Sequence, residues 1–231
     1  MREVDMNTNR IARIGGWTAV AAGILGAAAG ITLLAVAPQV SPDVFSYPFT
    51  SGGFAAIQSA FFIHHLAMAF ALAAFWRAGL AGAGRFATVA AWASVGVMLL
   101  LAVQELVAIL AADAPHPSPT TDIIEGAYGM ISLALGLTLV LYGIAAARAR
   151  VLTGAGRWAL TIVGAYLFVP LTPAIFAGFV AGRIAITVWL LLFAWWGLVM
   201  IRWADAAARR RMPVVDVRRT AVASDSVGGA S

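Results

Sequence analysis

The sequence predicts an all-α polytopic membrane protein with six transmembrane helices and both termini in the cytoplasm. The 231 residues are 62% hydrophobic and only 11% charged, with a mean hydropathy of +0.91. A soluble domain of this size would lack the polar side chains to cover its surface, so we expect lipid to be its solvent. Its apolar stretches span about 15–37, 54–76, 86–112, 124–147, 158–178 and 183–203. Each stretch exceeds the roughly 20 residues that a membrane-spanning helix needs, and their continuous character excludes a β-barrel.

The arginines predict the orientation of these spans. The chain has 15 arginines and no lysine, and 14 of the arginines flank the spans on one side. That side carries Arg2, Arg10, Arg13, Arg77, Arg85, Arg148, Arg150, Arg157 and the six from Arg202 to Arg219, while the other side carries Arg183. Because cytoplasmic loops retain positive charge, both termini are expected inside. We therefore divide the chain into a cytoplasmic tail (1–14), a six-helix domain (15–203) and an arginine-rich tail expected to be disordered (204–231).

Composition also excludes several classes of function. The arginine asymmetry accounts for the net charge of +5, so the expected partner is the lipid bilayer and not nucleic acid. The absence of cysteine removes thiolate metal sites, disulfides and cysteine nucleophiles, and the absence of lysine removes a retinal Schiff base. No catalytic or phosphate-binding motif of soluble enzymes is present. An enzyme is therefore unsupported, and no cofactor is predicted.

The first apolar stretch carries a face of small residues at Ala22, Gly26 and Gly30. Such faces let the backbones of two membrane helices approach closely. The face predicts internal packing against a neighbouring helix or, alternatively, a seam between two copies of the chain. Residues 35–37 resemble a signal-peptide cleavage site, but the apolar run before them is longer than usual, so we expect this helix to be retained.

The first external loop (38–53) is rich in proline and carries Phe45, Tyr47 and Phe49. Aromatic side chains are enriched at the membrane–water interface, so the loop is expected to lie on the membrane surface.

The second external loop (113–122) contains three prolines and leads into the fourth span. Thr121 or Asp122 is a natural N-cap for that helix, which would put Glu125 favourably in its first turn.

The fifth span contains Pro170 and Pro173. Only about 18 Å of helix would precede Pro170, so the helix must continue through the prolines with a kink or unwind there. Each proline lacks the N–H that bonds four residues back, which frees the carbonyls of Tyr166 and Val169. In lipid these carbonyls need another partner.

Polar groups in the spans are few and gather in the outer half of the membrane. Counting 1.5 Å per residue puts the two histidines of the second span about 15 Å from the outer surface and the carboxyl of the third about 10 Å from it. Burial of such groups is costly, so each is a candidate for a site facing the bundle interior. The candidates are His64, His65, Glu105, Gln58, Gln104, Glu125, Arg183 and Tyr166, with the helix break at Pro170 and Pro173.

Helical spacing predicts which of these groups meet. Gln58 and His65 share one face of their helix and are expected to point inward, whereas His64 points about 100° away and is expected to pack or hydrogen-bond against a neighbouring helix. A buried Glu105 should be protonated or paired. His65 is its partner at the nearest depth, and Arg183 is the alternative closer to the surface.

Three uses of these groups remain open. They are internal hydrogen bonds that fix the bundle, or a proton or substrate pathway open to the outside, or a metal or haem site. A metal site made of His65, Glu105 and His116 is conceivable but follows no known ligand spacing.

Four segments resemble a group of small multi-pass bacterial membrane proteins of unknown function. They are the run Asn9–Trp17 that enters the first helix and residues 64–66, 104–106 and 169–173. The likeness spans most of residues 9–203 and implies a multi-pass protein of the bacterial cytoplasmic membrane, without implying an activity. Together, these observations favour a non-enzymatic accessory or sensor-like bundle. The alternatives are a small transporter or proton-coupled carrier with an outward-facing His/Glu site, and a metal- or haem-binding protein.

Overall fold

The computed structural model describes residues 2–210, which form helices and connecting loops without a β-strand. Six segments are long and apolar enough to cross a membrane, the fifth being the interrupted helix Gly154–Phe176, so the predicted all-α fold with six membrane-spanning segments is confirmed. The helices are α1 (Arg2–Ala35), α2 (Ser51–Arg77), α3 (Arg85–Ile109), α4 (Pro119–Ala149), α5 (Ala159–Tyr166), α6 (Thr172–Phe176) and α7 (Phe179–Arg209). A 3-10 turn (Gly154–Trp158) precedes α5, and a π-helical turn (Leu167–Leu171) separates α5 from α6.

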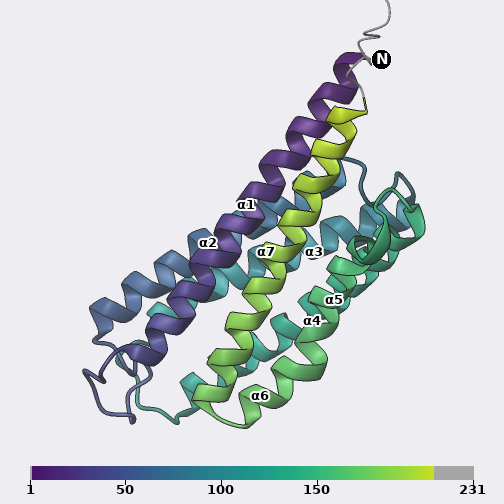
Figure 1. Ribbon diagram of the computed structural model, residues 1–231. Helices are drawn as coiled ribbons and strands as arrows, with labels where there is room; N and C mark the ends of the chain where they lie inside the picture. Colours follow the sequence, from purple (N-terminus) through teal and green to yellow (C-terminus); the bar gives the residue numbers. More distant parts are fainter. Residues whose placement is uncertain (1, 211–231) are drawn as a thin grey trace, which may run out of the picture.

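The helices form a closed ring in the order α1, α2, α3, α4, α5, α7. Both described ends of the chain, at the start of α1 and the end of α7, lie at one end of the bundle, as Figure 1 shows. We call this the terminal end. The opposite end carries the connections after α1 and α3, and we call it the loop end.

The long helices α1 and α7 pack side by side in opposite directions (Figure 1). Three glycines of α1 at seven-residue intervals, Gly16, Gly23 and Gly30, face α7 along this seam. A Cβ on Gly16 would stand 2.8 Å from the Gly197 carbonyl oxygen, and one on Gly30 would stand 2.6 Å from the Thr187 hydroxyl oxygen. The seam therefore depends on close backbone approach, which is how membrane helices associate without a hydrophobic driving force.

The small-residue face predicted on the first helix is used inside the chain. Ala22, Gly26 and Gly30 are all buried. A Cβ on Gly26 would stand 2.6 Å from His64 Nε2 and 3.0 Å from a methyl group of Leu190. These contacts match the internal-packing alternative.

The terminal half of the bundle is filled by aromatic rings. Phe75, Tyr142, Phe193 and Trp196 have no exposed surface. The Phe75 ring centre lies 5.5 Å from that of Tyr142 and 5.3 Å from that of Trp196. The Tyr142 hydroxyl donates to the Leu72 carbonyl oxygen at 3.1 Å, so the polar atom of this ring is satisfied as well. This half of the bundle is a closed core.

The first and last helices are longer than their apolar stretches. α1 begins at Arg2 and not near residue 15, and α7 continues to Arg209 and not to 203, so parts of both predicted tails are helical. Hydropathy marks only the lipid-facing part of a helix, whereas residues such as Arg, Ala and Met continue a helix into water. The remainder of the tail predicted to be disordered, residues 211–231, lies outside the described residues.

The fourth span begins earlier than predicted. Its N-cap is Ser118, not Thr121 or Asp122, and Pro119 occupies the first turn. Ser118 and Thr121 form a reciprocal capping box. Proline at the first helical position loses no hydrogen bond, so Ser118 followed by Pro119 is a typical start of a helix. The sequence analysis chose the capping residues Thr121 and Asp122 instead.

The fifth span continues through its prolines as a widened turn. The Thr172 N–H bonds to the Leu167 carbonyl oxygen five residues back, and the Thr172 hydroxyl donates to the same oxygen at 2.7 Å. Of the two alternatives predicted, continuation of the helix is found and unwinding is not. A π-turn accommodates Pro170 because it changes the spacing of the hydrogen bonds without ending the helix.

Candidate functional site

A buried polar cluster lies near the loop end between α2, α3 and α4. Its centre is Glu105, one turn before the end of α3. Gln58 lies two turns into α2, with His65 on the same face, and Tyr128 comes from α4. The exposed fractions of Gln58, His65 and Glu105 are 8, 7 and 6%, so Gln58 and His65 face inward as the helical spacing predicted.

Hydrogen bonds connect these side chains through one carboxylate oxygen. Glu105 Oε2 accepts from Gln58 Nε2 at 2.9 Å and from the Tyr128 hydroxyl at 2.7 Å. The same Gln58 nitrogen donates to the Tyr128 oxygen at 3.0 Å. These three groups therefore form a closed triangle that joins three helices. We call them, together with His65, the Glu105 cluster.

His65 approaches the other carboxylate oxygen. Its Nδ1 lies 3.5 Å from Glu105 Oε1, a polar contact without the geometry of a hydrogen bond. His65 is thus the nearest basic side chain to Glu105, as its depth in the sequence predicted.

Gln104 supports the cluster from the next position along α3. Its side-chain Nε2 donates to the Ile124 carbonyl oxygen at 3.2 Å. Its backbone carbonyl oxygen accepts from the Tyr128 hydroxyl at 3.4 Å. Both contacts tie α3 to α4 beside Glu105. Gln104 is therefore a tether between helices and not a ligand of the carboxylate.

Two loops close over the cluster. Residues 36–50 and 110–118 form what we call the loop clasp, paired through an isolated bridge between Val44 and Pro115. The Ser46 N–H donates to the Ala112 carbonyl oxygen at 3.1 Å, and the His116 N–H donates to the Asp43 carbonyl oxygen at 2.8 Å. Backbone pairing of this kind gives the clasp a defined structure.

The aromatic residues of the first loop turn toward the protein. Phe45 packs edge to face on Phe54 with 5.7 Å between the ring centres, and Tyr47 packs on Phe179 at 6.3 Å. Phe49 is half-buried. Phe45 and Tyr47 therefore have protein neighbours, and the expectation that the loop lies on the membrane surface stays a prediction. Aromatic side chains in a short loop can pack against lipid or against protein, and the sequence does not tell which of the two they contact.

The clasp contacts the cluster through a small apolar layer. Ala108, Ala111 and Ile124 are buried there, and Phe45 and Tyr128 pack against them. Tyr128 thus has its ring in the layer below the clasp and its hydroxyl in the Glu105 cluster. A displacement of the clasp would act on the cluster through this ring.

Arg183 lies at the edge of the site. Its guanidinium carbon stands 5.2 Å from the centre of the Phe179 ring, and it is near enough to Glu105 and Tyr128 for their charges to interact. Within residues 2–210, however, its guanidinium group has neither a salt bridge within 4.0 Å nor a hydrogen bond of good geometry. Arg183 therefore acts on Glu105 at longer range, and the predicted alternative of direct pairing is not found.

The metal site that the sequence left conceivable is not assembled. His116 belongs to the loop clasp, where its Nε2 lies 3.7 Å from Glu125 Oε1 and its Nδ1 lies 3.3 Å from the Thr121 hydroxyl. No group of three His, Cys, Asp or Glu side chains able to hold a metal ion occurs among residues 2–210. The trio of His65, Glu105 and His116 is thus not formed, because the proline-rich loop holds His116 near the start of α4. The contact between His116 and Glu125 also places Glu125 outside the Glu105 cluster.

The proline break does not join the site either. Val169, Pro170 and Pro173 are exposed on the outside of the bundle, and Tyr166 is only half-buried, without a hydrogen bond to the Glu105 cluster in the described part of the chain. Depth along the membrane placed these residues at the level of the cluster, but they lie on another side of the fifth span. Pro170 and Pro173 thus mark the predicted helix break, and Tyr166, the site candidate of this span, is not brought to the Glu105 cluster.

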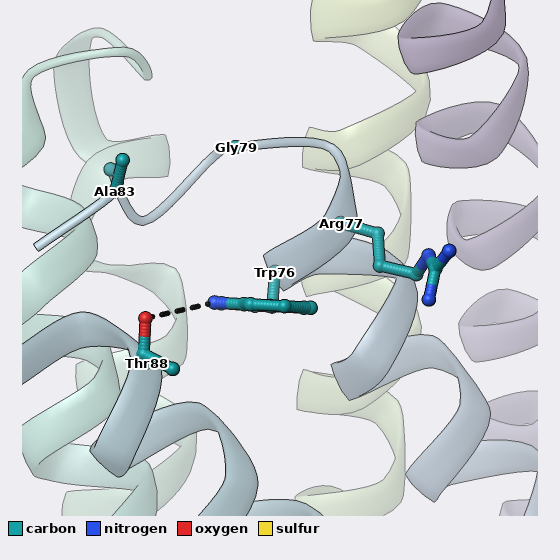
Figure 2. Close-up of a pocket in the computed structure, with 6 residues that line it drawn as sticks. Trp76, Arg77, Gly79, Ala83 and Thr88 are labelled. Carbon is teal, nitrogen blue, oxygen red and sulfur yellow. Dashed lines mark hydrogen bonds between the residues drawn. The ribbon is translucent and has the colours of Figure 1, made fainter. Parts of the chain in front are cut away.

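A shallow hollow of about 430 Å³ lies at the terminal end between α2 and α3. Figure 2 shows Trp76 donating through Nε1 to the Thr88 hydroxyl at 3.4 Å, while the Arg77 side chain points away from them. Gly79 and Ala83 form the turn above this pair. With its cation directed away, the hollow brings no group of reactive side chains together.

Tyr128 is the member of the site that the sequence analysis missed. A tyrosine inside a span needs a partner for its hydroxyl, and this was a usable signal. Its facing toward Glu105 does not follow from the sequence, because depth along a helix does not tell on which side of the bundle that helix lies.

Comparisons of the chain with models of protein families, with curated proteins and with solved structures find no match.

Proposed function

We propose that the protein is a non-enzymatic integral membrane protein, an accessory or sensor-like helix bundle of the bacterial cytoplasmic membrane. The observation that carries this proposal is the Glu105 cluster. Its carboxylate is held by side chains from two other helices and closed off by the loop clasp. A buried carboxylate that accepts hydrogen bonds from neighbouring helices fixes one arrangement of those helices, whereas a catalytic or transport site needs access for its substrate.

The loop clasp is the part we assign to sensing or to partners. It is an ordered surface at the loop end, and the Tyr128 ring connects it to the Glu105 cluster. A partner or ligand that shifted the clasp would therefore change the packing of α2, α3 and α4 beneath it. Arginines at the other end supply a second, positively charged surface for lipid or protein.

The proposed orientation puts the loop end outside and both termini in the cytoplasm. Because the chain has no cysteine, single cysteines report on sidedness directly. In intact cells, Ser41→Cys in the loop clasp should react with a membrane-impermeant maleimide, and Thr153→Cys at the terminal end should react only after the membrane is breached. Both positions are exposed, so accessibility to water is matched. Labelling of Thr153→Cys alone in intact cells would reverse the orientation.

A flux assay tests the proposed function. Purified protein in liposomes with an imposed proton gradient should give the same pH change as empty liposomes. The variants His65→Ala and Glu105→Gln should change only the stability or assembly of the protein. Their proton flux should equal that of the wild type. A proton-dependent flux in the wild type that either variant abolished, with the variant still folded, would refute the accessory function.

A second candidate, a proton-coupled carrier, is favoured by one observation. Arg183 is a cation at the loop end with no acidic partner within 4.0 Å in residues 2–210, beside a buried carboxyl group. Such a pair could hold an anion or a proton on an external path. Against this candidate stands the closed aromatic core around Phe75 and Trp196, which leaves the terminal half without a polar route.

A further inference from the structure

The hollow of Figure 2 lies where two membrane spans end, at the level of the lipid head groups. The span Ser51–Arg77 ends at its edge, and the span Arg85–Ile109 begins there. A helix of 25 residues is about 38 Å long and the hydrocarbon core is about 30 Å thick, so the ends of α3 reach the head-group region. In a bilayer, the hollow of about 430 Å³ is therefore surrounded by phospholipid head groups.

Arginines from α2 and α3 stand at the rim of this hollow. Thr88 lines it, and Arg85 precedes Thr88 by three residues, so both lie on one face of α3. Arg77 lines it from the end of α2, with its guanidinium group on the side away from Thr88 (Figure 2). Both arginines are exposed, so a ligand can reach their charged groups.

The end of α4 brings a third arginine to the same place. The Arg148 guanidinium carbon stands 5.9 Å from the centre of the ring of Phe86, the residue after Arg85. The loop between α2 and α3 also meets α4, because a Cβ on Gly82 would stand 3.2 Å from the Ala149 Cβ. Three helices thus contribute one arginine each to what we call the arginine corner.

The three cations of the arginine corner have no acidic partner in the described part of the chain. None of them forms a salt bridge within 4.0 Å. The segments that carry them, residues 51–104 and 126–204, contain no aspartate or glutamate. Arginine binds a phosphate group through paired, charge-assisted hydrogen bonds. An anionic phosphate of the head-group region is therefore the complementary ligand.

The surface of α3 next to the hollow suits an acyl chain. The Trp76 ring, which lines the hollow, packs on Trp92 with 5.4 Å between the ring centres. Trp92 lies about one turn beyond Thr88 and is 49% exposed, and Val89 is 68% exposed. Tryptophan is typical of the membrane interface, with its apolar body toward the lipid chains. A ligand with both a phosphate and an apolar chain matches this surface, whereas free phosphate matches only the rim.

His64 offers no comparable site. It packs between α1 and α2 with Nε2 against Gly26, so the packing expected for it from the sequence is found. Its ring nitrogens are enclosed, and the apolar groove beside it presents no polar atom to a ligand.

We propose that the arginine corner binds an acidic phospholipid, with the phosphate held by Arg85 and Arg77 and an acyl chain along Trp92. The proposal rests on the positively charged surface assigned above to lipid or protein, and it names lipid as the occupant. It involves neither Glu105 nor the movement of protons. A flux that refuted the accessory function would therefore leave this proposal standing.

Native mass spectrometry of the detergent-purified protein with dioleoyl phosphatidylglycerol tests this proposal. Dioleoyl phosphatidylcholine, which has the same chains and no net charge, is the control lipid. The wild type should retain phosphatidylglycerol at concentrations at which it retains no phosphatidylcholine. Arg85→Gln should weaken the binding of phosphatidylglycerol about fivefold, the loss typical of one arginine near an anionic lipid surface. Arg202→Gln, which removes an exposed arginine of α7 outside the corner, should leave this binding unchanged.

A substitution that keeps every charge completes the test. Ala83→Phe fills the hollow from an exposed position and should abolish the retention of phosphatidylglycerol, while Ala155→Phe, exposed at the same end of the bundle, should not. Equal retention of the two lipids by the wild type would overturn the proposal. An equal loss in Arg85→Gln and Arg202→Gln would overturn it as well, because net charge and not the arginine corner would then attract the lipid. Unchanged binding in Ala83→Phe would place the lipid elsewhere on the protein, with the same consequence.

Discussion

Replacing Glu105 with leucine is expected to cost the protein about 2–3 kcal/mol of unfolding free energy. Leucine fills a similar volume but accepts no hydrogen bond. The Gln58 amide and the Tyr128 hydroxyl would then lose the oxygen to which they donate at 2.9 and 2.7 Å, in a site closed to water. An orphaned buried donor costs more than the hydrogen bond itself contributes, which makes this a large effect for one side chain.

Glu105→Gln separates the loss of hydrogen bonding from the loss of charge. The amide oxygen still accepts from Tyr128 and Gln58, and the amide nitrogen can donate toward His65, so a loss below about 1 kcal/mol is expected. Reversible unfolding in mixed micelles of increasing SDS content, followed by circular dichroism, gives the free energies. Glu125→Leu is the matched control, because its pair with His116 is long and its side chain 54% exposed. A Glu105→Leu protein as stable as this control would contradict the structural role of the cluster.

Gly23→Leu should be the most damaging single substitution in the α1–α7 seam. A Cβ at this position would stand 2.5 Å from the Leu190 carbonyl oxygen and 2.7 Å from the Ala194 nitrogen. Both atoms belong to the backbone of α7, which cannot yield as a flexible side chain would. The two helices would have to separate, so we expect a loss of about 3 kcal/mol or more.

The same unfolding measurement checks this prediction with Gly96→Leu as its control. Gly96 is an exposed glycine of α3, and a Cβ there would meet no atom within 4 Å. Leucine at that position should leave the stability unchanged or raise it by about 0.5–1 kcal/mol through its better helix propensity. If Gly23→Leu were tolerated as well as Gly96→Leu, the antiparallel contact between α1 and α7 would not exist as described.

The number of spans could be predicted from the sequence because each span is one long apolar run. Exposing such a run to water costs much free energy, and this cost depends on the residues of that run alone. Helix ends depend on finer choices. The start of α4 at Ser118 and Pro119 depends on which residue caps the helix, and an N-cap contributes only about 1 kcal/mol to helix stability. The sequence shows the glycines that let α1 pack closely against α7. It does not show which helix they contact, because small residues allow close packing against any neighbouring helix.

The candidate site could be predicted in part. Depth and facing along a single helix placed Gln58, His65 and Glu105 together, because both quantities follow from the helical repeat alone. Which side of the bundle another helix occupies does not follow from depth. For that reason Tyr128 was missed, while Tyr166 was a candidate for a site from which the packing of the fifth span separates it. His116, named only as a conceivable metal ligand, is held away from the site by the loop clasp.

A double-mutant cycle on Glu105 and Tyr128 tests the central claim most directly. That claim is that a buried carboxyl group fixes the loop end by direct hydrogen bonds between helices. The unfolding free energies of wild type, Glu105→Leu, Tyr128→Phe and the double variant give the coupling between the two side chains. The 2.7 Å contact predicts a coupling of about 1 kcal/mol or more, with the double variant more stable than the sum of the single losses implies. A coupling of zero within error would mean that the two groups do not meet in the membrane, and would contradict the account.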